Sequence, residues 1–308
     1  MSIRRITWLI ISVGIIYIFL SGCKTKINQA NISDSPPVRI GFMVCNSKAE
    51  TEARFRPLAA YLTARLHREF VPVAIDTTDF VQAVSEKKVD FTHTNSLLYI
   101  IMNKDYGVDV LAADVRGKYG YKSAGAIMVL KDSPIHTIAD LKGKRMVFGP
   151  MLAPTGYLSQ YYLMLQNGFD PETGLAFYTI PPGSYKHEKV IYSLLFGKYD
   201  AAAVPELDFE LMSKEGRIDP ADFRVVAEGQ PIPYCTFGVA EGVDEGLARE
   251  VKRALLSLKP DDTVDLDGER VKVLKAAMLD GIADVKDSDY DIVRTMARKC
   301  GMPPYQKY

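Results

Sequence analysis

Residues 145–158 read Arg145-Met-Val-Phe-Gly-Pro-Met-Leu-Ala-Pro-Thr-Gly-Tyr-Leu158. The apolar run 146–148 predicts a buried strand, which the following Gly-Pro pair ends. Thr155 suits the N-cap of a helix that continues to residue 166. Where a strand leads through a tight loop into a helix, the free backbone N–H groups at the start of the helix can bind a small anion. The same order also occurs in an ordinary βα turn, so this stretch alone leaves both interpretations open.

The N-terminus has the features of an export signal. Arg4 and Arg5 precede an apolar run at 6–20, and Leu-Ser-Gly-Cys occupies 20–23. A basic start, an apolar centre and small residues before a cut are typical of a secretory signal peptide. The Leu-Ser-Gly-Cys box resembles that of bacterial lipoprotein signals, which implies cleavage before Cys23 and lipid attachment to its sulfur. An uncleaved membrane anchor is the alternative, and both place the remaining chain outside the cytoplasm.

The remaining composition suits a two-domain protein behind a short tether. Residues 24–37 are polar and end in Pro-Pro, which predicts a tether. The 308 residues hold 38 basic and 38 acidic side chains, so no basic bias indicates nucleic acid or an anionic membrane surface. Besides Cys23 the chain has Cys45, Cys235 and Cys300. An odd set in an oxidising compartment leaves at least one thiol free or ligand-bound.

The first half of the mature chain alternates strands and helices. Strands are predicted at 38–44, 70–75 and 88–91, with helices at 51–66 and from 80 to 84. This order calls for a parallel, doubly wound sheet. The ligand crevice of such a sheet lies at the carboxyl ends of its strands. Cys45, residues 77–80 and residues 93–96 are predicted there.

The second half repeats the pattern. Strands are predicted at 123–130, 146–148, 177–180, 199–204, 223–226 and 231–239, with a loop and helix over 183–196 and helices at 247–258 and 270–279. Related runs occur in both halves, as Glu86-Lys-Lys-Val-Asp90 and Gly197-Lys-Tyr-Asp200. We therefore expect two lobes of similar architecture joined by two crossing strands. One lobe comprises 38–128 plus 232–308, and the other comprises 129–231.

An ordered series of short motifs resembles one family. The series is Tyr121-Lys-Ser, Asp140-Leu-Lys-Gly-Lys144, Phe148-Gly, Thr155-Gly-Tyr-Leu, Asn167-Gly-Phe-Asp-Pro171, His187-Glu, Gly197-Lys-Tyr-Asp200, Ile232-Pro and Asp289-Tyr-Asp-Ile-Val-Arg294. Together, over about 38–300, these resemble the phosphonate/phosphite-type substrate-binding proteins of ABC importers. The resemblance implies a type II periplasmic binding fold, with two α/β lobes that close on a ligand by a hinge motion and have no catalytic activity.

The resemblance also implies ligand-binding residues. The family's oxyanion loop reads Ser-Thr-Ser-Gly where this chain has Ala153-Pro-Thr-Gly156, so two hydroxyls and one N–H are missing. The loss of several donors weakens the case for a simple phosphonate. The residues expected at the site are the donors Thr155, Gly156 and Tyr157, the walls Tyr121 and Phe80, and the polar contacts His187, Glu206 and Cys235.

Several of these residues have structural alternatives. Thr155 also suits a helix cap only, Tyr121 hinge packing and His187 a surface position. His93 is interpreted as a loop histidine with satisfied hydrogen bonds. Glu206 follows a buried strand, where an unpartnered acid is costly, and this favours a role in the site.

Cys45 and Cys235 have three interpretations. They form a disulfide, they are small buried hydrophobes, or they ligate a soft cation or metalloid with His93 or His187 nearby. No Cys-x-x-Cys or clustered histidine spacing supports a metal. We therefore expect no metal and no cofactor.

The expected function is solute binding. The sequence has no Gly-x-Ser-x-Gly, Walker loop or His-Glu-x-x-His motif. We expect a monomeric, lipid-anchored protein that delivers a small, phosphonate-like solute to an ABC importer. The alternative is a sensory partner of a membrane kinase, with a metalloid or another ligand.

Overall fold

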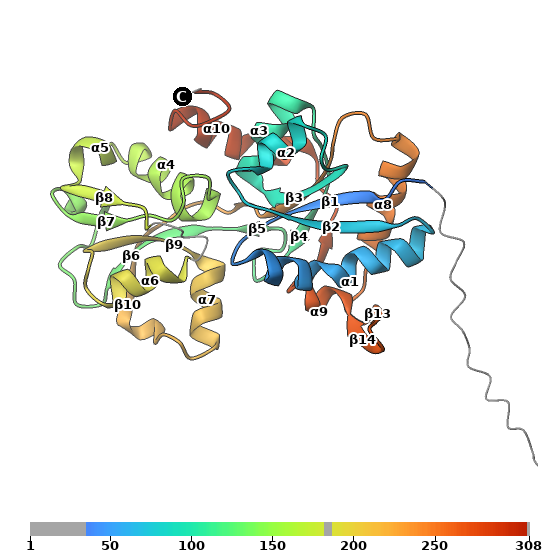
Figure 1. The fold of residues 1–308 in the computed structure, drawn as a ribbon. Helices are drawn as coiled ribbons and strands as arrows, with labels where there is room; N and C mark the ends of the chain where they lie inside the picture. The colour runs from blue at the N-terminus through green and yellow to red at the C-terminus, as the bar shows by residue number, and fades with distance from the viewer. Residues whose placement is uncertain (1–34, 182–186, 307–308) are drawn as a thin grey trace, which may run out of the picture. The chain divides into compact units, whose positions relative to one another are not determined.

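The computed structural model describes residues 35–181 and 187–306 (Figure 1). The predicted signal peptide, its Cys23 and most of the predicted tether lie outside the described residues. Among the described residues, no helix combines the length and the apolar character needed to cross a membrane.

The first sheet is mixed and has six strands in the order β15-β4-β12-β3-β1-β2. One end of this sheet is the predicted parallel unit, in which β1 pairs with both β2 and β3. The late strand β12 returns antiparallel between β3 and β4. The strands are β1 (Val38–Met43), β2 (Phe70–Ile75), β3 (Phe91–Asn95), β4 (Asp109–Val115), β12 (Cys235–Val239) and β15 (Gly281–Ala283).

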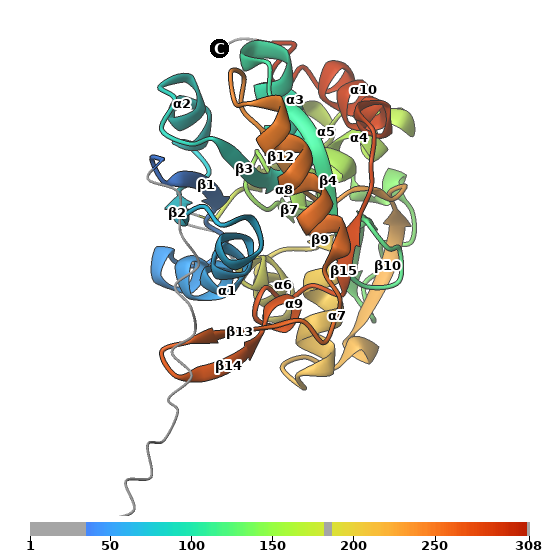
Figure 2. The same ribbon diagram turned by 90° about the vertical axis from the view of Figure 1, so that its right-hand side faces the viewer.

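Helices cover both faces of this sheet (Figures 1 and 2). Alternate residues of β1, such as Ile40 and Phe42, pack against Leu58 and Leu62 on one face. That face is covered by α1 (Lys48–Leu66), α8 (Glu245–Ser257) and α9 (Val273–Ala276). The other face is covered by α2 (Phe80–Ser85), α3 (Ser96–Tyr106) and α10 (Asp291–Lys299).

The second sheet has five strands in the order β10-β6-β9-β7-β8. They are β6 (Gly125–Leu130), β7 (Arg145–Val147), β8 (Phe177–Thr179), β9 (Ala201–Pro205) and β10 (Phe223–Glu228). One face packs against η2 (Pro154–Leu158) and α4 (Ser159–Gln166), and the other against α6 (Glu188–Leu195) and α7 (Glu206–Lys214). Helix α10 of the first sheet's layer also packs against α4.

Two crossing segments connect the sheets. The first sheet takes its strands from 38–115 and 235–283, and the second from 125–228, so the chain passes between them twice. The short strands β5 (Lys122–Ser123) and β11 (Ile232–Pro233) pair antiparallel in these segments. The fold is the expected two-lobed, type II periplasmic binding fold.

Smaller elements complete the chain. They are η1 (Ile138–Leu141), α5 (Pro171–Gly174), η3 (Pro220–Asp222), β13 (Thr263–Leu266), β14 (Glu269–Lys272) and η4 (Asp287–Tyr290).

Three local predictions are wrong. Thr155 is not an N-cap, because the helical segment begins with a π-helical turn whose N-cap is Ala153. The helix predicted at 270–279 is instead the end of a hairpin followed by the short α9. His93 is not in a loop but in the middle of the buried strand β3.

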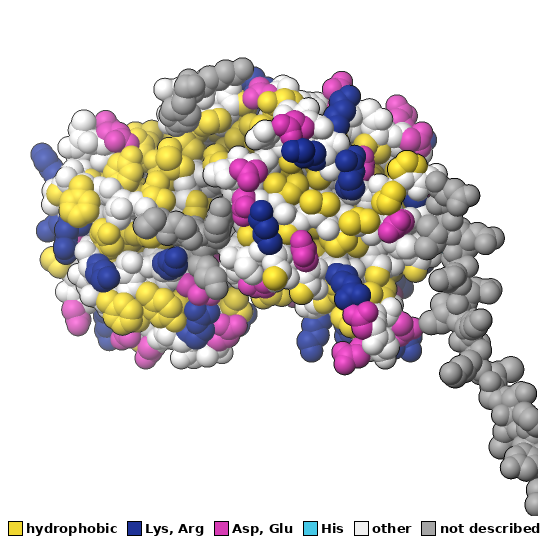
Figure 3. All heavy atoms as spheres, in the orientation of Figure 1, with side chains coloured by type: hydrophobic (Ala, Val, Ile, Leu, Met, Phe, Trp, Pro, Cys, Tyr) yellow, Lys and Arg dark blue, Asp and Glu magenta, His cyan; other side chains and the backbone are white. Residues whose placement is uncertain are grey.

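On the face shown in Figure 3, basic and acidic side chains are interspersed with apolar ones.

Candidate functional site

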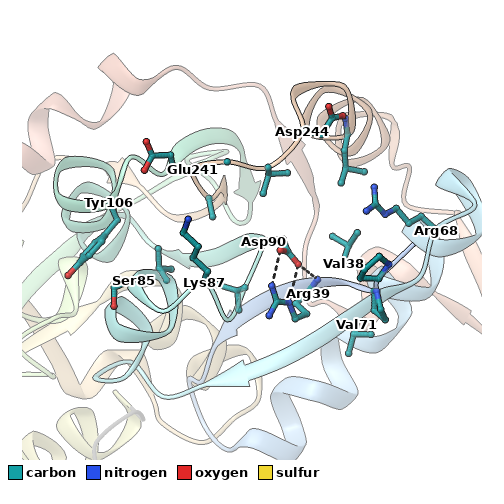
Figure 4. Close-up of a pocket in the computed structure, with 18 of the residues that line it drawn as sticks. Val38, Arg39, Arg68, Val71, Ser85, Lys87, Asp90, Tyr106, Glu241 and Asp244 are labelled. Atoms are coloured by element: carbon teal, nitrogen blue, oxygen red, sulfur yellow. Dashed lines mark hydrogen bonds and ion pairs between the residues drawn. The ribbon is translucent and has the colours of Figure 1, made fainter. Parts of the chain in front are cut away.

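Two cavities lie at opposite ends of the first sheet. The larger, of about 1030 Å³, lies where the parallel strands begin, beside Val38 and Arg39 of β1 and Val71 of β2 (Figure 4). In it, Arg39 pairs with Asp90, which immediately precedes β3. Because ligands of open α/β sheets bind at the carboxyl ends of the strands, this cavity is not the expected ligand site.

The smaller cavity, of about 170 Å³, lies at the carboxyl ends of the strands. The first sheet contributes residues that follow β1 and β2 and residues at the ends of β3 and β4. The second contributes the loop after β7 and the starts of α6 and α7. The lining residues used below are Met43, Cys45, Arg54, Asn95, Arg116, Thr155, His187, Glu188, Asp208, Tyr234, Cys235 and Met278.

A direct hydrogen bond joins the two walls of this cavity. Asn95 is the N-cap of α3, and its side-chain oxygen accepts from Leu97 and Leu98 N–H. Its Nδ2 donates to Leu152 O at 3.0 Å, in the loop that follows β7. Asn95 therefore fixes the loop that carries Thr155 against the first sheet.

His187 closes one side of the same loop. Its ring lies so close to the backbone that a Cβ added at Gly156 would lie 2.3 Å from His187 Cε1. At Gly149 an added Cβ would lie 2.7 Å from His187 Nδ1. Only glycine fits beneath this imidazole. His187 Nδ1 is buried against this backbone and has no hydrogen-bond partner among the described residues.

Two arginines bring positive charge to the cavity. Arg54 of α1 donates through Nε to Ala277 O at 2.7 Å. Arg116 directly follows β4. Burial lowers the pKa of its guanidinium, but the nearby Tyr234 and Asp208 raise it more, so this pKa lies above its ordinary value. The acid Glu188 is already paired with Arg217 at 2.7 Å. The guanidinium groups thus offer donors suited to an oxyanion.

Sulfur atoms line the cavity as well. Cys45 and Cys235 are free thiols, so the disulfide interpretation is wrong. Burial raises the pKa of both thiols, that of Cys235 far above its ordinary value. Both are therefore protonated at neutral pH in the absence of a ligand. The thioethers of Met43 and Met278 are further lining groups.

The expected site residues fall into two groups. Thr155, His187 and Cys235 line the cavity together. Gly156 and Tyr157 lie in the same turn, with the Tyr157 ring 5.0 Å from that of Phe148. The others lie outside this lining, and ligand contact for each of them stays a prediction.

Each residue outside the lining has other neighbours. Phe80 is fully buried, with its ring against Gly41. Tyr121 lies in a crossing segment, where its carbonyl accepts from Tyr234 N–H. Glu206 Oε2 lies 3.5 Å from Lys118 Nζ. Burial and a hydrogen bond with Glu228 raise the pKa of Glu206 to about 7.

The sequence analysis placed Asn95 at the crevice, within 93–96, but it missed Arg54, Arg116 and Asp208. Arg116 directly follows β4, and that position at the carboxyl edge of a sheet is a signal that could have indicated it. Arg54 and Asp208 lie within helices, where nothing in the local pattern separates them from solvent-facing charges.

A family model matches most of the chain. Residues 40–290 match the model described as the periplasmic substrate-binding protein of phosphonate ABC transporters. The tetrathionate sensor histidine kinase TtrS of Salmonella typhimurium is 28% identical over 235 residues, which are 71% of this chain and 39% of that kinase. The chain therefore spans about two fifths of the length of this curated relative.

Solved structures share the fold at low identity. PhnD1 from Prochlorococcus marinus, in complex with methylphosphonate, has a TM-score of 0.71 and 16% identity, covering 85% of this chain and 97% of that one. XAC2383 from Xanthomonas citri, bound to ATP, has a TM-score of 0.70 and 18% identity, covering 86% and 97%. At such identities the likeness concerns the fold alone.

Proposed function

The chain belongs to the family of periplasmic substrate-binding proteins of phosphonate ABC transporters, and from this premise we propose that it binds a small oxyanion in the cavity of Arg54, Arg116 and Thr155. Proteins of this family bind small solutes outside the cytoplasm and work with ABC permeases, and they are not enzymes. We further propose that this chain is a lipoprotein that delivers its solute to an importer.

The observation that carries the proposal is that Arg54 and Arg116 line the same cavity as Thr155. The family's oxyanion loop has lost two hydroxyls here, and Pro154 has no N–H to donate. The guanidinium groups of Arg54 and Arg116, which line the cavity, supply hydrogen-bond donors that replace the missing ones. The free volume of about 170 Å³ suits a solute of a few heavy atoms.

Calorimetry with named anions tests this proposal. Methylphosphonate, phosphate, sulfate and tetrathionate are titrated into the purified chain, because the first and last are bound or sensed by the relatives named above. Arg54→Gln and Arg116→Gln should each weaken binding of the accepted anion about tenfold or more, since a hydrogen bond to a charged group contributes about 1.5–3 kcal/mol.

The matched control is Arg249→Gln on α8. Arg249 is exposed and, within the described part of the chain, pairs with Glu245 of its own helix, so its loss should leave affinity unchanged. Unchanged affinity in both cavity variants, or no binding of any of the four anions, would overturn the proposal.

Closure of the two lobes is part of the same proposal. The predicted lobe boundary at 128 falls inside β6 of the second sheet, so we assign the strands of 38–115 and 235–283 to one lobe and those of 125–228 to the other, with the hinge in the crossing segments. Binding of the accepted anion should then lower the radius of gyration in solution scattering. An unchanged radius with saturating anion would contradict closure.

A second candidate function is that of a sensory partner. The specific support is the likeness to the tetrathionate sensor kinase. Cells that lack this protein should lose uptake of the labelled anion if it serves an importer. Unchanged uptake together with loss of an anion-dependent transcriptional response would favour the sensor instead.

Lipid anchoring is tested separately. The proposal rests on Leu20-Ser-Gly-Cys23 after an apolar run. Cys23→Ala should abolish palmitate labelling and membrane retention, whereas Cys300→Ala, as a control for thiol loss, should not. Labelling that persists in Cys23→Ala would contradict the lipoprotein assignment.

A further inference from the structure

Three side chains of types that bind metal ions lie close together beside the smaller cavity. His93 comes from β3, Asp114 from β4 and Cys235 from β12, which are adjacent strands of the first sheet. One ligand atom from each of the three lies within 4.8 Å of the others. All three side chains are buried. This cluster is the one group of three or more such side chains found among residues 35–181 and 187–306.

The hydrogen bonding of this cluster is incomplete. His93 and Asp114 are joined by one hydrogen bond of 2.9 Å between Nε2 and Oδ2. Asp114 Oδ1 has no hydrogen-bond partner among the described residues, although its residue is 0% exposed. A carboxylate oxygen left unpaired in the interior is costly. Its lone pairs are therefore available to a cation.

We propose that His93, Asp114 and Cys235 form a binding site for a divalent cation of the zinc type. Imidazole, carboxylate and thiolate are the three ligand types that Zn²⁺ accepts in proteins. A divalent cation with one carboxylate and one thiolate also sums to zero charge, which suits a buried position.

The geometry requires only small side-chain shifts. Zinc bonds of about 2.0–2.3 Å at tetrahedral angles place ligand atoms about 3.3–3.6 Å apart. The His93 and Asp114 atoms would separate slightly from 2.9 Å, and the sulfur would approach from within 4.8 Å. The cation would deprotonate the thiol, as coordinated thiols are deprotonated outright.

The surroundings supply a shell and an entrance. The His93 ring packs against the rings of Phe42, Phe55 and Phe237, with centroids 5.4, 4.8 and 4.5 Å away. These rings hold the imidazole and exclude water on their side. Cys235 lines the cavity described above, so an ion can enter from there. Three protein ligands leave a fourth position, which would face the cavity and take water.

Cobalt titration of the purified full chain tests the site. Co²⁺ is added to reduced, chelator-treated protein, and one equivalent should give a thiolate-to-cobalt charge-transfer band and the strong visible bands of a four-coordinate ion. Zn²⁺ should then remove both. Cys235→Ser should abolish the charge-transfer band. Asp114→Asn should weaken Co²⁺ affinity at least about 100-fold, since loss of outer-shell partners alone costs about 10–100-fold.

The matched control is another thiol. Cys300→Ser removes a thiol outside the cavity lining and should keep the bands unchanged. Circular dichroism checks that each variant folds. Absence of the charge-transfer band in the wild-type chain overturns the proposal. This outcome does not depend on whether any variant folds. Equal bands in Cys235→Ser would overturn it too, and would leave His93 and Asp114 as a buried hydrogen-bonded pair.

Discussion

Asp200 accepts three hydrogen bonds from Arg145, from its backbone N–H at 2.8 Å, from Nε at 3.1 Å and from Nη2 at 2.9 Å. Arg39 donates the same three to Asp90 in the first sheet, at 2.7, 3.2 and 3.0 Å. Each aspartate N–H also donates to the carbonyl of its arginine. The two lobes thus share one arginine–aspartate arrangement at the start of β1 and of β7, and the related runs ending at Asp90 and Asp200 indicate it in the sequence.

Removing the charge of Asp200 should destabilise the second lobe in a pH-dependent way. Asp200→Asn should cost about 1 kcal/mol at pH 7, because the pair is partly exposed and solvent screens it. The Arg145 guanidinium is the main cause that lowers the pKa of Asp200. A lowered pKa gives stability that is present above the ordinary value of 3.8 and is lost as pH falls through the folded value.

Urea unfolding of wild type and variant at pH 7 and pH 3 measures this effect. The difference in unfolding free energy should shrink at pH 3. A difference that stays constant between the two pH values would exclude the ionised pair as its source.

The two halves differ at the third residue before the aspartate, which is Gly197 in one half and Lys87 in the other. Gly197 adopts φ +67°, and an added Cβ would meet no atom within 4 Å. Lys87, three residues before Asp90, has φ 53°. Gly197→Ala should therefore cost about 1 kcal/mol from backbone conformation alone. Lys87→Gly should instead stabilise by about 0.5 kcal/mol, because glycine adopts this conformation without strain although it loses more entropy. Unfolding midpoints that shift in the same direction for both variants would contradict this reasoning.

The free energy of unfolding should fall as pH rises from about 5 to about 7, because Glu206 loses its proton in this range. Burial is the largest cause that raises its pKa to about 7, and Glu228 adds to it through a hydrogen bond and its charge. A raised pKa gives stability that is present below the ordinary value of 4.5 and is lost as pH rises through about 7. The pKa of Glu228 is lowered, so its own contribution is lost only as pH falls below this range.

Glu206→Gln is the test, because glutamine keeps a neutral donor at all pH values. The wild type should lose unfolding free energy from pH 5 to pH 7.5 relative to this variant. Superimposable pH profiles would show that Glu206 titrates normally. Lys118→Met serves as a control for loss of the neighbouring cation, which lowers the pKa of Glu206, and it should shift the decline to higher pH.

The sequence predicts the fold better than the site, for a physical reason. Alternation and helical spacing report which face of an element is buried, and they predict the elements that form both sheets. They leave 96–115 unassigned, because α3 is apolar around its whole first half and shows no amphipathic period. The cavity depends on which strand ends and helix faces meet. Local pattern does not report that Arg54 and Arg116 converge, or that His93 lies across β12 from Asp114.

The contact between His187 and Gly156 offers the sharpest test of the loop geometry. An added Cβ at Gly156 would lie 2.3 Å from His187 Cε1 and 2.7 Å from Nδ1. The φ of Gly156 is not in the left-handed region, so the imidazole itself is the obstacle. Gly156→Ala should therefore destabilise by about 1–3 kcal/mol through overpacking. His187→Ala removes the obstacle and, because His187 lines the cavity proposed to bind the anion, should weaken binding of the accepted anion by about 1 kcal/mol.

A double-mutant cycle separates the two effects. In Gly156→Ala/His187→Ala the new methyl group occupies space that the imidazole has left, so the double variant should be more stable than Gly156→Ala alone. The coupling energy should be about 1 kcal/mol or more, as expected for residues in direct contact. Strictly additive losses of unfolding free energy would show that the ring does not rest on this glycine. Loss of anion affinity in the double variant, with stability restored, would then identify the imidazole as a ligand-binding group in addition to a packing one.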